Sequence, residues 1–286
     1  MSRSILLRTL GPVLLMLGLA SCAGVNLAYE HADWWMTRMA TRYVELDSVQ
    51  AKAVRAQFGH VHTWHRSHEL PVYAQLFDRA ADHMQRGLTR ADIKWVMGVA
   101  NERWRVTSNE LARELAPVLV TLNPEQMVQM ADNLAYENTR YVKSQMDLNP
   151  TQRIKERSDW LIKHIEKWTG DLTADQRRRI EMVPAATPEF PELRLAERKR
   201  RQAKFLSLVR DERNPGALQS AIVGLLSAPR DGASDEYRRS VARYEDQLMQ
   251  MVLDLDRSLS AEQRSHAVKR MRKFAQDFRA LAVAQT

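Results

Sequence analysis

A cluster of histidines in the first third of the chain is the part of the sequence best suited to metal chemistry. Four side chains of the ligand type recur there at spacings of three and four residues: His62, His65, His68 and Glu69. Residues with this spacing share one face of a helix, and imidazole is a good ligand for zinc or copper. We therefore consider a metal site here. The alternative is a solvated helix face before Leu70-Pro71, with histidines that form ordinary hydrogen bonds.

The motifs of common enzyme classes are absent from the sequence. There is no Gly-x-Ser-x-Gly elbow, no His-Glu-x-x-His pair and no glycine-rich phosphate loop among the 286 residues, which include only 10 glycines. The single cysteine, Cys22, lies at the end of an apolar leader and excludes thiol catalysis elsewhere. We predict a protein that is not an enzyme and requires no cofactor.

The leader places the protein in a cell compartment. An apolar run from Leu10 to Leu19 follows two arginines and is too short to span a bilayer as a mature helix. The next residues complete a Leu19-Ala20-Ser21-Cys22 motif that resembles the lipobox of bacterial lipoproteins. This resemblance implies a signal peptide over 1–21, acylation of Cys22 and, with Ala23 next, the periplasmic side of the outer membrane. The alternative is an ordinary secretory signal.

Two adjacent tryptophans follow the predicted anchor. Trp34 and Trp35 lie twelve and thirteen residues after Cys22. Because adjacent helical residues cannot both face one core, one of them could lie at the membrane interface, where indole is favoured. The alternative is that both pack partly against the domain.

A basic cluster is the main candidate for binding an anionic surface. Its residues are Arg194, Arg198, Lys199, Arg200, Arg201 and Lys204. The formal charge is +8 for the whole chain and +6 without the two leader arginines, which favours lipid headgroups or lipopolysaccharide phosphates. Nucleic acid is not expected in the predicted compartment. The alternative is a solvated face neutralised by neighbouring acids such as Glu197.

Apolar residues recur at helical spacing along the mature chain, and strand signals are nearly absent. The helical segments are 47–69, 89–116, 123–146, 149–168, 191–212, 235–257 and 260–283. We therefore predict an all-α multi-helix bundle. Three prolines within 183–191 predict a non-helical hinge between an N-terminal region, 22–182, and a C-terminal region, 192–286. The two regions could also form one domain.

Five predicted helix starts share one pattern, a leucine followed four residues later by glutamine. They are Leu46-Asp-Ser-Val-Gln50, Leu122-Asn-Pro-Glu-Gln126, Leu148-Asn-Pro-Thr-Gln152, Leu172-Thr-Ala-Asp-Gln176 and Leu259-Ser-Ala-Glu-Gln263, with Leu88-Thr-Arg-Ala-Asp92 as a near match. The pattern predicts capping boxes. It also resembles the Leu-Thr-x-x-Gln motif of the Spy/CpxP family of periplasmic helical proteins, which implies a chaperone or stress-signalling role. Capping alone is the alternative explanation.

A second resemblance covers more of the chain. The lipobox, Asp33-Trp34-Trp35, the helix start at Gln50 and Trp64-His65-Arg66…Glu69-Leu70-Pro71-x-Tyr73 are similar to an uncharacterised family of proteobacterial all-helical lipoproteins. This resemblance implies a location and a fold but no activity.

Together these features predict a lipid-anchored periplasmic protein with a non-enzymatic, protein-binding helical domain. Its partners would be the membrane, through the anchor, and other envelope proteins, as for an envelope chaperone or an assembly or stress factor. The alternative is an envelope protein that binds metal or anionic lipid. The oligomeric state is not fixed by the sequence.

Overall fold

The computed structural model describes residues 29–186 and 190–283. Within these residues the chain forms ten α-helices and no strand, which confirms the predicted all-α multi-helix bundle. The helices are α3 (Ala32–Ala40), α4 (Ser48–Arg86), α5 (Arg90–Leu119), α6 (Pro124–Gln145), α7 (Pro150–Thr169), α8 (Ala174–Ala186), α9 (Pro191–Asp211), α10 (Pro215–Ser227), α11 (Asp235–Ser258) and α12 (Ala261–Val283). None of the helices in the described part carries an apolar stretch long enough to cross a membrane.

The predicted capping boxes are confirmed. At the start of α4, the Asp47 carboxylate accepts a hydrogen bond from the Gln50 backbone N–H at 2.8 Å, and Gln50 Oε1 accepts one from the Asp47 N–H at 3.1 Å. The same reciprocal bonds begin five more helices, between Thr89 and Asp92, Asn123 and Gln126, Asn149 and Gln152, Thr173 and Gln176, and Ser260 and Gln263. Each box satisfies backbone donors that a helix start would otherwise leave without partners.

Four of these helix starts meet in two pairs. The start of α8 contacts the start of α12 through Gln176 and Gln263, whose side-chain amides donate to each other at 2.9 Å in both directions. Each amide also donates to a backbone carbonyl beside its partner's motif, that of Ser258 or Asp171. The starts of α4 and α6 are paired in the same way. A local capping motif therefore also joins helices that are distant in the sequence.

Helix α4 continues through Pro71 to Arg86, so the prediction that this helical segment ends at residue 69 is wrong. A proline inside a helix removes one backbone hydrogen bond and costs about 3 kcal/mol. Burial offsets this cost, because Leu70 and Ala74 on either side of the proline are each only 1% exposed. They pack in a cluster with residues of α12.

The stretch 183–191, predicted to be non-helical, is helical in part. Helix α8 includes Val183 to Ala186, and its buried Pro184 lies in the last turn, where it has no N–H to donate to the carbonyl four residues back. Pro191 is the first residue of α9, a position that needs no N–H donor. Only Phe190 is described as non-helical in this stretch, since 187–189 lie outside the described residues.

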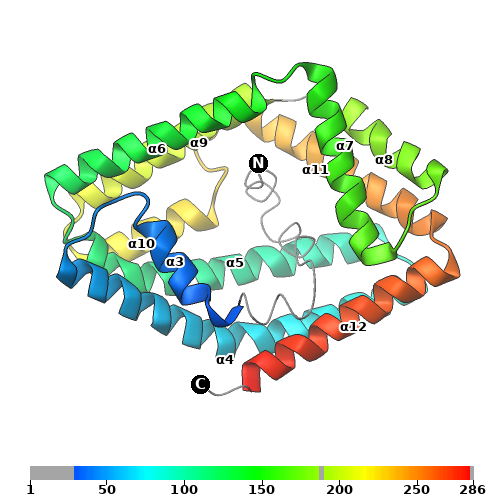
Figure 1. The fold of residues 1–286 in the computed structure, drawn as a ribbon, viewed down its shortest axis with the longest axis horizontal. Helices are drawn as coiled ribbons and strands as arrows, with labels where there is room; N and C mark the ends of the chain where they lie inside the picture. Colours follow the sequence, from blue (N-terminus) through cyan, green and yellow to red (C-terminus); the bar gives the residue numbers. More distant parts are fainter. Residues whose placement is uncertain (1–28, 187–189, 284–286) are drawn as a thin grey trace.

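Helices from both sides of this stretch pack together around the four-sided outline in Figure 1. Helix α12 runs along α4, α9 lies beside α6, and α10 packs on α5. Two hydrophobic clusters combine early and late residues: Ala112, Ala116, Leu122 and Met130 with Val209, Leu218 and Ile222, and Leu70, Ala74, Phe77 and Trp168 with Phe274 and Phe278. The division into 22–182 and 192–286 stays a prediction, but its two parts share a core.

Candidate binding groove

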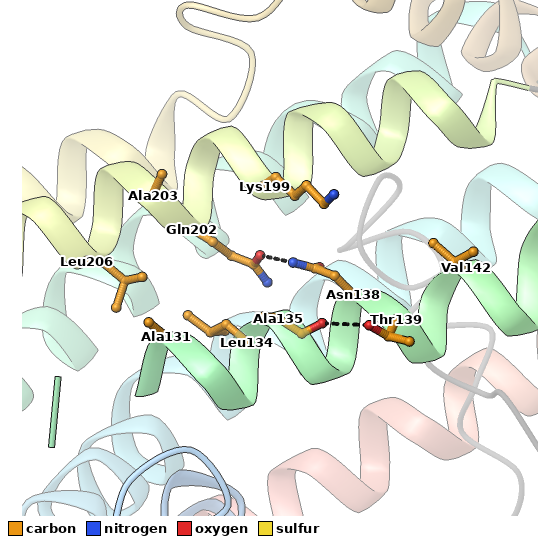
Figure 2. A pocket seen from close by; sticks show the side chains of 10 residues that line it. All are labelled: Ala131, Leu134, Ala135, Asn138, Thr139, Val142, Lys199, Gln202, Ala203 and Leu206. Carbon is orange, nitrogen blue, oxygen red and sulfur yellow. Dashed lines mark hydrogen bonds between the residues drawn. The ribbon is translucent and has the colours of Figure 1, made fainter. Parts of the chain in front are cut away.

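An open groove of about 430 Å³ lies between α6 and α9 (Figure 2). Most of its lining residues are alanine, leucine or valine. They are Ala131, Leu134, Ala135, Asn138, Thr139 and Val142 from α6, and Lys199, Gln202, Ala203 and Leu206 from α9. The groove therefore presents mainly apolar surface to solvent.

Small side chains leave this space between the two helices. Ala131 and Ala135 lie four residues apart on one face of α6, and Ala203 contributes only a methyl group from α9. The leucines Leu134 and Leu206 pack against the buried cluster that includes Met130 and Val209. Because these leucines pack against the core, part of the groove lining is fixed by the packing of the domain.

A polar bridge crosses the groove at Asn138. This buried side chain donates through Nδ2 to Gln202 Oε1 at 2.7 Å, as Figure 2 shows. Its Oδ1 accepts a hydrogen bond from Arg198 Nε at 2.7 Å. The bridge satisfies the buried amide and ties α6 to α9 by a contact that does not fill the groove.

Lys199 is the one charged side chain among the ten that line the groove. It is exposed, so its ammonium group remains hydrated beside the apolar surface. The lining contains no carboxylate, imidazole or thiol. Its chemistry suits the binding of an apolar segment that carries a nearby negative charge, rather than acid–base or nucleophilic catalysis.

Two of the predicted metal ligands, His62 and His65, contact Tyr29. His65 Nδ1 lies 2.9 Å from the Tyr29 hydroxyl, and the His62 and Tyr29 ring centres are 4.8 Å apart. Burial, and to a lesser extent His62, lowers the pKa of His65 to about 4. The pair is thus part of an aromatic contact between α4 and the residues that precede α3.

The other two predicted ligands are also engaged. His68 is exposed and stacks on Trp64, with ring centres 5.5 Å apart, while buried Glu69 accepts a hydrogen bond from Arg103 of α5 at 3.2 Å. In the described residues, no three His, Cys, Asp or Glu side chains are placed to hold a metal ion. The shared helix face was expected correctly, but neighbouring elements divide its side chains between them.

The basic cluster on α9 is largely occupied by contacts within the protein. The guanidinium of Arg194 lies 4.4 Å from the ring centre of Phe190, and Arg200 donates to both carboxylate oxygens of Glu197. Arg198 donates to Asn138, and Arg201 donates to the Leu225 carbonyl. Lys199 and Lys204 are exposed. The arrangement differs from a continuous patch of solvated cations, since Arg198 and Arg201 hold α9 against α6 and α10.

The two tryptophans near the predicted anchor lie on α3. Trp34 and Trp35 are each 52% exposed and contact each other edge to face, with ring centres 4.8 Å apart. Each side chain is thus about half covered, so a place at the membrane interface and partial packing against the domain both stay predictions. The predicted lipidation site, Cys22, and the signal peptide over 1–21 lie outside the described residues.

Sequence reasoning missed the groove. The available signal was the spacing of Ala131, Ala135 and Thr139, three small side chains at four-residue intervals on one helix face. Such a pattern indicates that another helix either packs closely on this face or leaves a space beside it. It does not identify that helix. The partner, α9, begins more than fifty residues later and was interpreted through its charges alone.

Comparisons with known proteins place the chain in a family. No curated protein and no solved structure matches it. One family does match, over residues 42–238 and hence over well more than half of the chain; its description is "Family of unknown function (DUF6279)". This agrees with the expectation of an uncharacterised family, while lipoprotein status and kinship with Spy/CpxP proteins stay predictions. By the extent of this match, the chain belongs to the DUF6279 family of unknown function.

Proposed function

We propose that this protein is a lipoprotein of the bacterial outer membrane, held on the periplasmic side through Cys22, whose α6–α9 groove binds apolar segments of other envelope proteins. The observation that carries the binding function is the open, mainly apolar groove, lined by alanines and by leucines that pack against the core. The lipobox-like sequence ending at Cys22 supports the location.

The dimensions of the groove favour a short polypeptide segment as its occupant. Ala131 and Val142 are eleven residues apart on α6, which corresponds to about 16 Å at 1.5 Å per residue. An extended segment of about five residues has this length. The alanines leave room for the side chains of such a segment. Because the groove is open, an internal segment of a client chain can enter it as well as a chain terminus.

The charge of the groove favours a segment flanked by acidic residues. Lys199 lies in the lining, Arg198 lies beside Asn138, and the ten lining residues include no acid. Electrostatic attraction would mainly speed the encounter and select among partners, while the apolar contact would supply affinity. This combination suits an envelope chaperone or assembly factor that recognises exposed apolar segments of acidic clients.

Binding can be measured with carboxymethylated α-lactalbumin, an acidic client that stays unfolded. We expect saturable binding in fluorescence anisotropy, and we expect Ala135→Glu to weaken it by on the order of tenfold or more, because a carboxylate then replaces apolar surface and repels the client. Ala135 is exposed, so the substitution should leave the fold intact.

The matched control is Tyr136→Glu, which makes the same kind of change at the next residue. Tyr136 is 64% exposed and does not line the groove. Its variant should bind within about twofold of the unmodified protein, since a rim charge changes affinity little. Equal weakening by both substitutions, or no saturable binding by the unmodified protein, would contradict the proposed function.

A further inference from the structure

Helix α3 has one face on the domain and one face in solvent. Met36 and Ala40 pack against the buried cluster of Val54, Phe58 and Val118. The opposite side of the helix carries four exposed residues, Trp34, Trp35, Arg38 and Met39, which we call the outer face of α3. No residue of α3 is buried, so the helix lies on the domain without entering its core.

The outer face combines large apolar side chains with a cation. Trp34 and Trp35 are each 52% exposed and Met39 is 53% exposed. The Arg38 guanidinium lies 5.7 Å from the Trp34 ring centre, and exposed Arg42 follows soon after the helix. Tryptophan and arginine beside each other are typical of surfaces that enter the headgroup region of a bilayer, where indole is favoured and anionic lipid attracts the cation.

The four residues of the outer face include no carboxylate, and exposed Glu30 lies just before the helix. The nearest acid of the helix, Asp33, is half-buried and acts electrostatically on His62 of α4, where it opposes the lowering of the pKa of His62 that burial and Arg66 cause. It therefore lies toward the domain side of α3. The outer face itself carries a positive charge without a carboxylate.

The length of chain between the predicted anchor and α3 places a membrane within reach. Trp34 lies twelve residues after Cys22, so the connecting chain spans at most about 40 Å when fully extended. This step rests on the proposed function, because it takes Cys22 as the point of acylation. An acylated Cys22 would keep the outer face near the bilayer at high effective concentration.

We propose that the outer face of α3 lies in the headgroup region of an anionic phospholipid bilayer and forms a second, non-covalent contact beside the lipid anchor. Two contacts would fix the orientation of the domain on the membrane, whereas a single flexible tether would not. The apolar side chains enter the interface, and Arg38 pairs with lipid phosphates.

The contact can be tested with a chain that begins at Cys22 and so keeps all described residues. Cys22 is its only thiol, and it can be coupled to a maleimide phospholipid in vesicles of phosphatidylethanolamine and phosphatidylglycerol. Tryptophan emission is then compared between vesicles with and without brominated acyl chains, because bromine quenches only indoles that enter the bilayer. We expect quenching that the double variant Trp34→Phe/Trp35→Phe reduces to background and Arg38→Glu reduces several-fold.

Trp104→Phe is the matched control, since Trp104 is similarly exposed at 47% but lies on α5. This variant should keep the full quenching. Equal emission on brominated and unbrominated vesicles, or quenching that survives the double variant, would overturn the proposed contact. Because coupling bypasses acylation in the cell, the anchor is tested separately, by the mass of the Cys22 peptide from membranes, and each proposal can fail without the other.

Discussion

The side chains of Gln50 and Gln126 bind each other through both their amide groups. Gln50 Nε2 lies 3.1 Å from Gln126 Oε1, and Gln126 Nε2 lies 2.6 Å from Gln50 Oε1. Each amide reaches further, to the backbone carbonyl of Thr121 or Glu45 beside the partner motif. One glutamine therefore caps its own helix and also joins two helix starts.

The variant Gln126→Ala tests this double role. It removes a partner from the buried Gln50 amide and from the Glu45 carbonyl, and a buried polar group without a partner costs about 1–3 kcal/mol. We expect the free energy of unfolding, measured by urea denaturation, to fall by about 2–3 kcal/mol. Gln152→Ala is the control: Gln152 occupies the same capping position but is exposed, so about 1 kcal/mol or less should be lost. If both variants lost the same free energy of unfolding, the motif would act through capping alone.

The sequence allowed the capping boxes to be predicted because every bond in them joins residues three apart. The pairing of Gln50 with Gln126 could not be predicted, since the two residues are 76 apart and the pattern is the same at Gln152, which is exposed. Pro71 was misjudged for a related reason. Its cost is local and visible in the sequence, whereas the burial of Leu70 that offsets it depends on α12.

The same limit applies to the candidate sites. The spacing of His65 and Glu69 correctly predicts a shared helix face, but Tyr29 and Arg103, which occupy these side chains, come from other segments. The charges of α9 are visible in the sequence, yet Asn138, the partner of Arg198 on α6, could not be identified from it. The groove exists only in the packed structure, because it is a space between helices that lie side by side.

The half-buried His65 predicts a pH-dependent stability. Its pKa is about 4 in the folded protein and about 6.5 in an unfolded chain, so unfolding takes up a proton in this window. Stability is therefore full above pH 6.5 and decreases as the pH falls towards 4, with a loss of about 2 kcal/mol between pH 7 and pH 5 from this group. The lowered pKa of His62 acts in the same direction.

The measurement is urea unfolding at pH 7 and pH 5 for the unmodified protein and for His65→Leu. The variant should lose most of this pH-dependent difference, even if its stability at pH 7 is lower. His68→Leu serves as the control, since the His68 ring is exposed against Trp64, and its difference between the two pH values should match that of the unmodified protein. An unchanged difference in His65→Leu would refute the assignment.

The packing of Phe274 leads us to expect that the regions 22–182 and 192–286 unfold together. Phe274 is fully buried, and its ring centre lies 5.6 Å from that of Phe77 and 5.3 Å from that of Trp168, both before the stretch 183–191. Phe274→Ala should cost about 3–5 kcal/mol, whereas Val283→Ala, at a residue 78% exposed, should cost less than about 0.5 kcal/mol.

Because this cluster spans both parts, urea unfolding should show a single transition by tryptophan fluorescence and by circular dichroism. Phe274→Ala should move that whole transition to lower urea concentration. Two separate transitions, of which Phe274→Ala shifts only one, would instead support two independent domains divided at 183–191.

Two substitutions of Asn138 distinguish its contribution to the stability of the fold from its contribution to client binding. Asn138→Leu leaves Gln202 Oε1 and Arg198 Nε without this partner, and it should reduce stability by about 1–3 kcal/mol. Asn138→Asp retains an acceptor for Arg198, and Gln202 can turn its amide to donate instead of accept. Its stability should stay within about 1 kcal/mol of the unmodified protein, since the bond to Arg198 becomes an ion pair between a guanidinium and a carboxylate.

When the acidic client is titrated, the order of the two variants in affinity should be the reverse of their order in stability. Asn138→Asp places a negative charge in the groove and should weaken binding, while Asn138→Leu, where folded, adds apolar surface and should bind at least as tightly. Thermal unfolding and fluorescence anisotropy on the same samples give both quantities. The contradicting result is that the less stable variant, Asn138→Leu, also binds the client more weakly than Asn138→Asp. The polar bridge would then change client affinity only by changing how well α6 and α9 are folded, and the groove would not be the binding site.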